Sequence, residues 1–386
     1  FGADTLQLQS TAGTSAAIME RHIAGDNATI SFDVQGRFTS FSSLDADAST
    51  GGNDSITLSI AGTSEDSSAI YDYNVIAGGM GGDSIQVSAS VPTSDVVSGD
   101  NLEYRRGFDA SGNRQHLSAS VSQGFTGGDD TIRVGQGDKI IFGGAGADTV
   151  LTNTVSGDRN IVFGDSGNVV FDPAASGALI QMMTTPETVG GHDRLTLGSG
   201  TSYLFGGLGN DSLTINASDT ASRIVIGDNG QVNFEGGIAS LAQTTGSDSV
   251  DATTVVDTFV LPNTGTNFVL GGPGFDVRSG SVGDSHRFLP GSGSINLSTK
   301  VVSVVVLGNH NDLAILHDGT YSSGDGTVSR PGSDFVLAPT TDGGTTPPSG
   351  GGSTGGTVTY VTKGTGSVTE DTTNRDRKST RLNSSH

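Results

Sequence analysis

Aspartate residues recur in this chain at the end of a short glycine-rich motif. The pattern Gly-Gly-x-Gly-x-Asp occurs four times, at residues 78–83, 143–148, 206–211 and 271–276. Glycines permit tight turns with positive φ angles and leave their carbonyl oxygens accessible, while the aspartate adds a hard anionic oxygen. Oxygen donors of this kind bind hard divalent cations. The motif therefore indicates cation-binding chemistry at these turns.

Short strands are expected after the turns. Residues 84–87, 149–151 and 212–215 carry apolar side chains at alternate positions, which is the pattern of a half-buried β-strand. The residues after Asp276 alternate less well, so this copy of the motif carries less weight.

The motif and the strand after it resemble the nonapeptide of the RTX (repeats-in-toxin) calcium-binding family, in which Gly-Gly-x-Gly-x-Asp-x is followed by an apolar residue. The resemblance implies an all-β fold, a right-handed parallel β-roll or β-helix solenoid with Gly-Asp-rich turns. It also implies Ca2+ ions bound at the turns. The expected metal ligands are Asp54, Gly78, Gly81, Asp83, Asp130, Asp138, Gly143, Gly146, Asp148, Asp165, Asp193, Gly206, Gly209, Asp211, Asp228 and Asp276.

The spacing of the aspartates predicts which turns stack. Weaker turns end at Asp54, Asp130, Asp193 and Asp248, and the step from Asp130 to Asp148 is as long as the step from Asp193 to Asp211. Each of these steps equals two nonapeptides, or one coil of a β-roll, and Asp138 lies near the half-coil position. We therefore expect each pair to share one ion: Asp130 and Asp148 with the carbonyls of Gly143 and Gly146, and Asp193 and Asp211 with those of Gly206 and Gly209. The steps from Asp54 to Asp83 and from Asp248 to Asp276 are longer, which predicts an extra half-coil or a bulging loop.

A longer repeat is superimposed on these turns. Gly-Asp pairs follow at residues 25–26, 99–100, 164–165, 227–228 and 283–284, and the steps between successive aspartates shorten gradually along the chain. Self-similarity of this kind predicts a solenoid in which each unit buries a face on its neighbour. The arrangement resembles the repeat region of very large bacterial surface or secreted calcium-binding proteins.

Composition agrees with a solenoid. The chain has 60 glycines, no cysteine and no tryptophan, and only 33% hydrophobic residues, which suits a thin internal ladder of apolar side chains. The predicted ladder is Ile132, Val134, Ile140, Phe142, Val150, Ile161 and Phe163, and helix is expected to be nearly absent. The net charge of −22 argues against nucleic-acid binding, and no apolar run is long enough to span a membrane.

Five regions are predicted along the chain. Residues 1–290 form the RTX-like repeat array, and residues 291–339 form degenerate repeats or a cap of the solenoid. Residues 340–356 are a Gly/Thr/Pro-rich linker. Residues 357–375 resemble the start of a VCBS-type β domain, through the string Gly-Thr-Gly-Ser-Val-Thr-Glu-Asp. Residues 376–386 match the translation of a sequencing adapter and are excluded from the fold.

No catalytic constellation is found, so the region is expected not to be an enzyme. The chain contains no His-Glu-x-x-His motif, and the Gly-x-Ser-x-Gly match at residues 351–355 lies in the linker. An EF-hand loop starting at Asp45 is rejected, because its sixth residue is Thr50 and its twelfth is Ile56.

Three functions remain open. The first is a calcium-binding structural region of a secreted or cell-surface bacterial protein, adhesin-like, which folds on calcium outside the cell after type I-like secretion. Its expected partners are calcium ions and a cell surface or polysaccharide. The second is the calcium-binding accessory region of a secreted enzyme or toxin whose catalytic domain lies elsewhere. The third is a β-solenoid scaffold whose degenerate turns bind no calcium.

Overall fold

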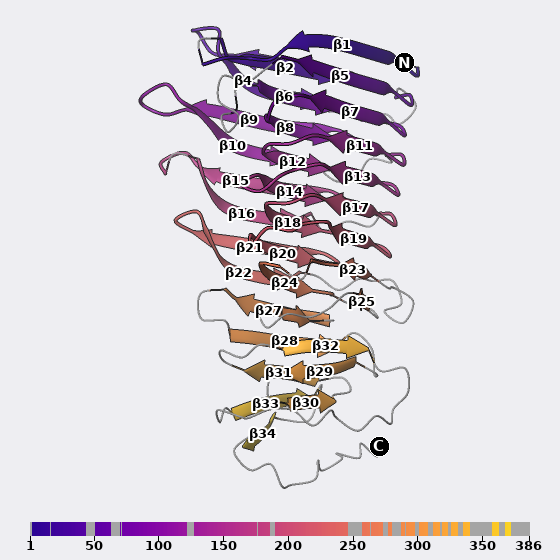
Figure 1. Ribbon diagram of the computed structural model, residues 1–386, viewed down its shortest axis with the longest axis vertical. Coiled ribbons are helices and arrows are strands. Elements are labelled where there is room, and N and C mark those ends of the chain that lie inside the picture. Colours follow the sequence, from indigo (N-terminus) through magenta and orange to yellow (C-terminus); the bar gives the residue numbers. More distant parts are fainter. Residues whose placement is uncertain are drawn as a thin grey trace.

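The protein is described by a computed structural model. It describes residues 2–272 with gaps at 16, 44–50, 63–69, 71, 122–126, 176, 186–189, 246–256 and 263, and beyond residue 272 mainly the strands. Every element in this part of the chain is a β-strand, so the expected near-absence of helix is confirmed for the described residues. Figure 1 shows the strands stacked one above another along the long axis of the molecule.

The strands form three sheets, two of them built from parallel coils. The first, which we call the outer sheet, has nine parallel strands in the order β1 (Thr5–Thr11), β5 (Ser55–Ala61), β7 (Ser84–Ala89), β11 (Thr131–Val134), β13 (Thr149–Thr152), β17 (Arg194–Leu197), β19 (Ser212–Ile215), β23 (Thr258–Val260) and β25 (Val277–Ser279).

The second, the central sheet, is parallel from β2 to β32 and has twelve strands: β2 (Met19–Ala24), β6 (Asp72–Ala77), β8 (Thr93–Ser98), β12 (Lys139–Phe142), β14 (Arg159–Phe163), β18 (Thr201–Phe205), β20 (Ser222–Ile226), β24 (Thr266–Leu270), β26 (Arg287–Leu289), β32 (Phe335–Pro339), β29 (Asp312–Leu316) and β30 (Gly319–Ser322).

The third, the hairpin sheet, is antiparallel and has thirteen strands: β3 (Thr29–Phe32), β4 (Phe38–Ser43), β9 (Leu102–Phe108), β10 (Arg114–Ser120), β15 (Gly167–Asp172), β16 (Ala178–Thr184), β21 (Gly230–Glu235), β22 (Ile238–Thr244), β27 (Gly291–Asn296), β28 (Val301–Leu307), β31 (Gly326–Arg330), β33 (Thr357–Thr362) and β34 (Ser367–Asp371).

One coil consists of an outer strand followed by a central strand. Thr131 of β11 pairs with Thr149 of β13, and Arg194 of β17 pairs with Ser212 of β19, so the step of two nonapeptides is one coil as predicted. Each coil has two corners. We call the passage from an outer to a central strand the polar corner, and the passage from a central strand to the next outer strand the glycine corner.

A β-hairpin is inserted at every second glycine corner. The chain passes from β8 through the hairpin β9–β10 to β11, whereas it passes directly from β12 to β13. Each hairpin adds two strands to the hairpin sheet. Between one hairpin and the next, the outer and central sheets also add two strands each. A unit of two coils and one hairpin therefore explains the longer sequence repeat.

The two longer spacings were predicted to contain an extra half-coil or a bulging loop, and the first of them contains no extra half-coil. The segment from Asp54 to Asp83 contains a single coil, β5 and β6, and its additional residues lie between Ala61 and Asp72. The step from Asp248 to Asp276 is not defined, because both residues lie outside the described part of the chain. The aspartate that directly precedes β23 is Asp257.

The core has two layers, one on each face of the central sheet. All seven residues of the predicted ladder are buried. Ile132, Val134 and Val150 are the buried positions of two outer strands with alternating burial, so they belong to the core layer between the outer and central sheets. Phe163 instead contacts Gly167 of β15, and Tyr203 meets Phe234 of β21, so this face of the central sheet packs on the hairpins. The aligned rings of Phe142, Phe163 and Phe205 stack there, with centroids 5.1 and 4.5 Å apart.

Candidate metal centre at the glycine corner

A column of aspartates runs along the glycine corner, one in each coil. Each aspartate stands immediately before an outer strand, and the strand register places these residues directly above one another. The members of this aspartate column are Asp4, Asp54, Asp83, Asp130, Asp148, Asp193, Asp211 and Asp257.

From Asp54 to Asp257, one oxygen of each carboxylate links neighbouring coils. Asp130 donates its backbone N–H to Asp148 Oδ1 at 2.7 Å, and Asp193 donates to Asp211 Oδ1 at 2.8 Å. The same bond recurs at every step of the column from Asp4 to Asp257. The aspartate thus satisfies a backbone donor at a turn, which fixes the orientation of its carboxylate.

In four members of the column the second carboxylate oxygen has no such partner. Oδ2 of Asp54, Asp83, Asp130 and Asp211 is buried and accepts no hydrogen bond. Each residue as a whole is at most 2% exposed. A buried carboxylate oxygen without a partner is costly unless a cation compensates it.

Glycine carbonyls face these oxygens. A Cβ atom on Gly99 would overlap both Asp130 Oδ2 and the carbonyl oxygen of Gly143. The equivalent pair at Gly25 is Asp54 Oδ2 with the Gly78 carbonyl, and further pairs lie beside Gly78, Gly143, Gly164, Gly206 and Gly227. Only glycine fits at these positions, and each cradle presents a carboxylate oxygen and a carbonyl oxygen to the same space.

The hairpin splits the motif without displacing its parts. Gly78, Gly99 and Gly143 stack in successive coils, although Gly99 is followed by a hairpin and the other two are not. After the hairpin the chain returns at Gly127 and Gly128 and reaches Asp130 at the usual place in the column. The Gly-Asp pairs and the weaker turns of the sequence are therefore two halves of one Gly-Gly-x-Gly-x-Asp turn.

The aspartates that precede the hairpins form a second set, Asp26, Asp100, Asp165 and Asp228. Asp100 Oδ2 accepts the backbone N–H of Ala145 at 2.6 Å, and Asp26 Oδ2 accepts that of Met80 at 2.8 Å. These carboxylates lie against glycines with positive φ angles, such as Gly144 at 118°. Each unit thus brings three carboxylates to the glycine corner, two from the column and one from this second set.

Burial makes the ionised column unfavourable in the absence of a cation. Burial raises the pKa of Asp83 to about 7, and the nearby charges of Asp54 and Asp26 add to the effect. Burial, with the neighbouring carboxylates, also raises the pKa of Asp130 and of Asp211 well above the ordinary range. The column therefore favours either a proton or a bound cation on these groups.

No basic side chain in the described part of the protein provides that charge. The ion pairs found among the described residues involve other carboxylates, and none of them uses Asp54, Asp83, Asp130 or Asp211. Nor does any group of three or more His, Cys, Asp or Glu side chains converge as a metal site within the described residues. The donors that face one another at this corner are carboxylate and backbone carbonyl oxygens, and hard oxygen donors of this kind are the ligands that Ca2+ takes in proteins.

The predicted glycine ligands divide into two groups in the structure. The first group is the first glycine of each motif. The carbonyl oxygens of Gly78, Gly143 and Gly206 each face the column aspartate of the preceding coil. The carbonyl that faces Asp148 Oδ2 belongs to Gly164 rather than Gly146. Gly81, Gly146 and Gly209 instead stack with Gly128 and Gly191 in a second glycine row.

Asp138 lies away from the column. It sits at the polar corner, where its carboxylate accepts the backbone N–H of Arg159 at 3.0 Å and pairs with that guanidinium at 3.4 Å. Asp276 lies outside the described residues. Asp165 and Asp228 belong to the second set of carboxylates beside the column.

Four aspartates of the site were not among the predicted ligands, Asp4, Asp26, Asp100 and Asp257, and neither were the glycines Gly99, Gly164 and Gly227, whose carbonyls face column aspartates. Asp257 lacks the preceding glycines, and its only sequence signal is the alternating Thr258-Phe259-Val260 strand that follows it. Asp26 and Asp100 belong to Gly-Asp pairs that the sequence does reveal. The sequence alone does not show that each pair belongs to the turn that is completed beyond the hairpin.

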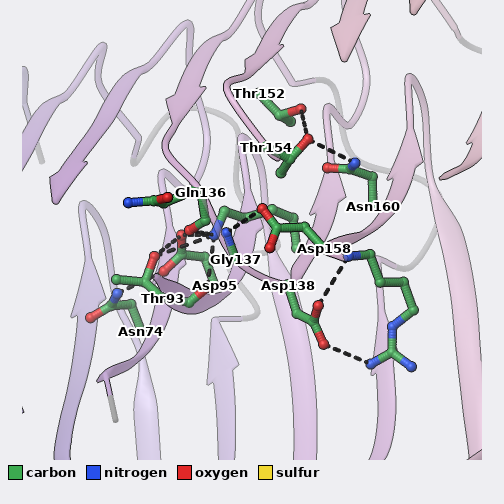
Figure 2. Close-up of polar contacts among 12 residues, drawn as sticks. Asn74, Thr93, Asp95, Gln136, Gly137, Asp138, Thr152, Thr154, Asp158 and Asn160 are labelled. Atoms are coloured by element: carbon green, nitrogen blue, oxygen red, sulfur yellow. Dashed lines mark hydrogen bonds and ion pairs between the residues drawn. The ribbon is translucent and has the colours of Figure 1, made fainter. Parts of the chain in front are cut away.

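The polar corner has a different chemistry. A row of polar side chains on the central sheet faces the outer sheet there, and it includes Asn74, Asp95 and Lys139 in paired register. Asn74 donates to Asp95 Oδ1 at 2.6 Å, and the Lys139 ammonium contacts Asp95 Oδ2 at 3.0 Å with both side chains fully buried. Figure 2 shows Asn74, Thr93 and Asp95 in this network, with Asp138 and Asp158 nearby.

No protein-family model, curated protein or solved structure matches the chain. The part of the chain that the structure describes contains no helix able to cross a lipid bilayer.

Proposed function

We propose that this chain is a calcium-binding structural repeat region of a secreted or cell-surface bacterial protein, adhesin-like, which folds on calcium outside the cell. The proposal includes a right-handed, β-roll-like winding of its coils. The resemblance of the turns to RTX repeats supports the extracellular, adhesin-like part of the proposal, and the absence of cysteine agrees with stapling by ions instead of disulfides.

One observation carries the calcium proposal. Asp54, Asp83, Asp130 and Asp211 are buried, each keeps an oxygen that accepts no hydrogen bond, and none of them pairs with a described basic side chain. In a solenoid without calcium-binding turns an asparagine could accept the same backbone N–H without a buried, uncompensated charge.

The residues that would hold calcium are the column aspartates through Oδ2 and the first glycine of each turn through its carbonyl oxygen. A bound Ca2+ would supply the positive charge that the corner lacks. The backbone bond from each aspartate to the next already fixes the carboxylates in a line. Binding would therefore stabilise neighbouring coils together, because each carboxylate belongs to the interface between two coils.

Calcium removal is the direct test. We expect affinities on the order of 0.1–1 mM, as in other extracellular modules, and a lower melting temperature when calcium is chelated. Circular dichroism and calorimetry would be recorded in chelator, in millimolar calcium, and in the same concentration of magnesium as the control ion. A melting temperature that is equal in all three solutions would exclude the proposed function.

A further inference from the structure

A notch lies on the solvent-facing side of the outer sheet, across β7, β11 and β13. It has a volume of about 450 Å3, which lies within the range of small-molecule sites. Its lining includes Gln86, Ser88, Arg133, Gly135, Leu151 and Asn153. The notch is separate from the aspartate column, which lies at the opposite corner of the coil.

The notch exists because one coil is shorter than its neighbours at the polar corner. β11 ends at Val134 and only residues 135–138 connect it to β12, whereas residues 153–158 connect β13 to β14 and β7 extends to Ala89. Gly135 stands at the recess, and a Cβ atom there would meet nothing within 4 Å. The hollow is therefore built by the lengths of the connections and needs no rearrangement of side chains.

Arg133 gives the notch its charge. It is exposed, and no ion pair or hydrogen bond of its guanidinium is found within the described residues. No outer-sheet strand contains Asp or Glu, although the chain as a whole has a net charge of −22. The nearest corner carboxylates are engaged, since Asp138 pairs with Arg159 and Asp158 accepts the backbone N–H groups of Gly137 and Val155.

The remaining lining is neutral and suited to hydroxyl groups. Gln86, Ser88 and Asn153 carry donors and acceptors, and Gln86 Nε2 already donates to Ser88 Oγ at 3.1 Å. Leu151 adds an apolar wall on the other side of Arg133, because β11 lies between β7 and β13 in the sheet. A guanidinium binds a carboxylate with two parallel hydrogen bonds.

We propose that the notch binds a carboxylate-bearing sugar unit of an acidic glycan. Arg133 holds the carboxylate, the amide and hydroxyl side chains bind ring hydroxyls, and Leu151 contacts the C–H face of the ring. Because the site is shallow and open, a single sugar unit binds weakly, with Kd on the order of millimolar. This inference goes beyond calcium binding and concerns a face of the protein that the calcium proposal does not use.

Ligand-observed saturation-transfer NMR on the calcium-loaded chain tests it. The probes are glucuronate and galacturonate, with glucose as the neutral sugar and acetate as the bare anion, each at about 10 mM. We expect transfer to at least one uronate and none to glucose or acetate. Absence of transfer to both uronates, or equal transfer to acetate, would overturn the proposal.

Three variants separate the notch from general electrostatics. Arg133→Gln is expected to weaken uronate binding at least tenfold. Gly135→Leu fills the recess while leaving Arg133 in place, and it is expected to weaken binding as much. Arg194→Gln removes an exposed arginine of the same sheet that does not line the notch, and it should leave binding unchanged. Equal loss in the Arg133 and Arg194 variants, with unchanged melting temperatures, would also refute the site.

Discussion

The two corners of each coil differ in what lies beside their carboxylates. At the polar corner Asp95 contacts Lys139, Asp138 pairs with Arg159, and Asp219 pairs with the Arg223 guanidinium. At the glycine corner Asp54, Asp83, Asp130 and Asp211 have no such partner among the described residues and face glycine carbonyls. The same coil therefore has one corner whose cations are encoded in the chain and, under the proposed function, one corner whose cation comes from solution.

The largest effect is expected at the polar corner and should not depend on calcium. Lys139→Met leaves the fully buried Asp95 without its cation, which costs about 3–5 kcal/mol of unfolding free energy. The loss should be the same in calcium and in chelator, measured by denaturant unfolding in both. The double variant Lys139→Met with Asp95→Leu removes both charges and should recover part of the loss. If the unfolding free energy of Lys139→Met fell only in calcium, the proposed difference between the two corners would be wrong.

At the glycine corner the effect should depend on the ion. Asp130→Asn keeps an oxygen for the N–H of Asp83 but removes the charge, so it should remove one ion's stabilisation, about 1.5–3 kcal/mol at about 10 mM calcium. In chelator the variant should be no less stable than the parent, because a buried carboxylate has been neutralised. Asp129→Asn, an exposed neighbour, is the matched control. Equal destabilisation with and without calcium would show that Asp130 acts only through its hydrogen bond.

The pH dependence should have opposite signs with and without calcium. Burial raises the pKa of Asp83 to about 7, so the calcium-free folded chain binds protons that the unfolded chain releases near the ordinary value of 3.8. The stability that protonation of Asp83 contributes is therefore complete below about pH 4 and is lost as the pH rises through about 7. In calcium, protons compete with the ion, so stability should rise over the same range. Melting temperatures between about pH 4 and pH 8 in both solutions measure this, and parallel curves would contradict it.

The smallest effect is expected for Asp138→Asn. Asp138 and Arg159 are each about one-third exposed, at 36% and 34%, and such pairs contribute at most about 1 kcal/mol. Calcium binding, followed by titration calorimetry, should be unchanged. A clear loss of bound ions would restore Asp138 as a ligand, in line with its half-coil position in the sequence.

Local patterns in the sequence predicted the parts of this fold that depend on nearby residues. The step of two nonapeptides predicted the coil from Asp130 to Asp148, and the alternation in residues 149–151 predicted the strand that follows. The hairpin sheet was not predicted, because Ile140, Phe142, Ile161 and Phe163 read as one buried ladder whether they face the outer sheet or the hairpins. Such strands are buried on both faces, and a continuous apolar run does not distinguish the two sides.

The site residues also divide into those that the local sequence predicts and those that depend on contacts between coils. Asp148 and Asp211 follow an uninterrupted motif and were recognised with their first glycines. The halves of the interrupted turn, Gly99-Asp100 and Gly127 to Asp130, are separated by the hairpin, so their common location depends on contacts between coils. Asp257 has no glycine signal at all and is identified only by its register beneath Asp211.

Each hairpin has two strands and accompanies two coils, and this limits how coils can be gained or lost between related chains. One hairpin covers two coils, so deleting a single coil such as residues 130–147 would leave one hairpin strand without a central strand behind it. Duplication or loss of a whole unit keeps all three sheets in register and keeps each carboxylate under the next. We therefore expect natural length variants to differ by whole units, so that the number of aspartates in the column changes two at a time.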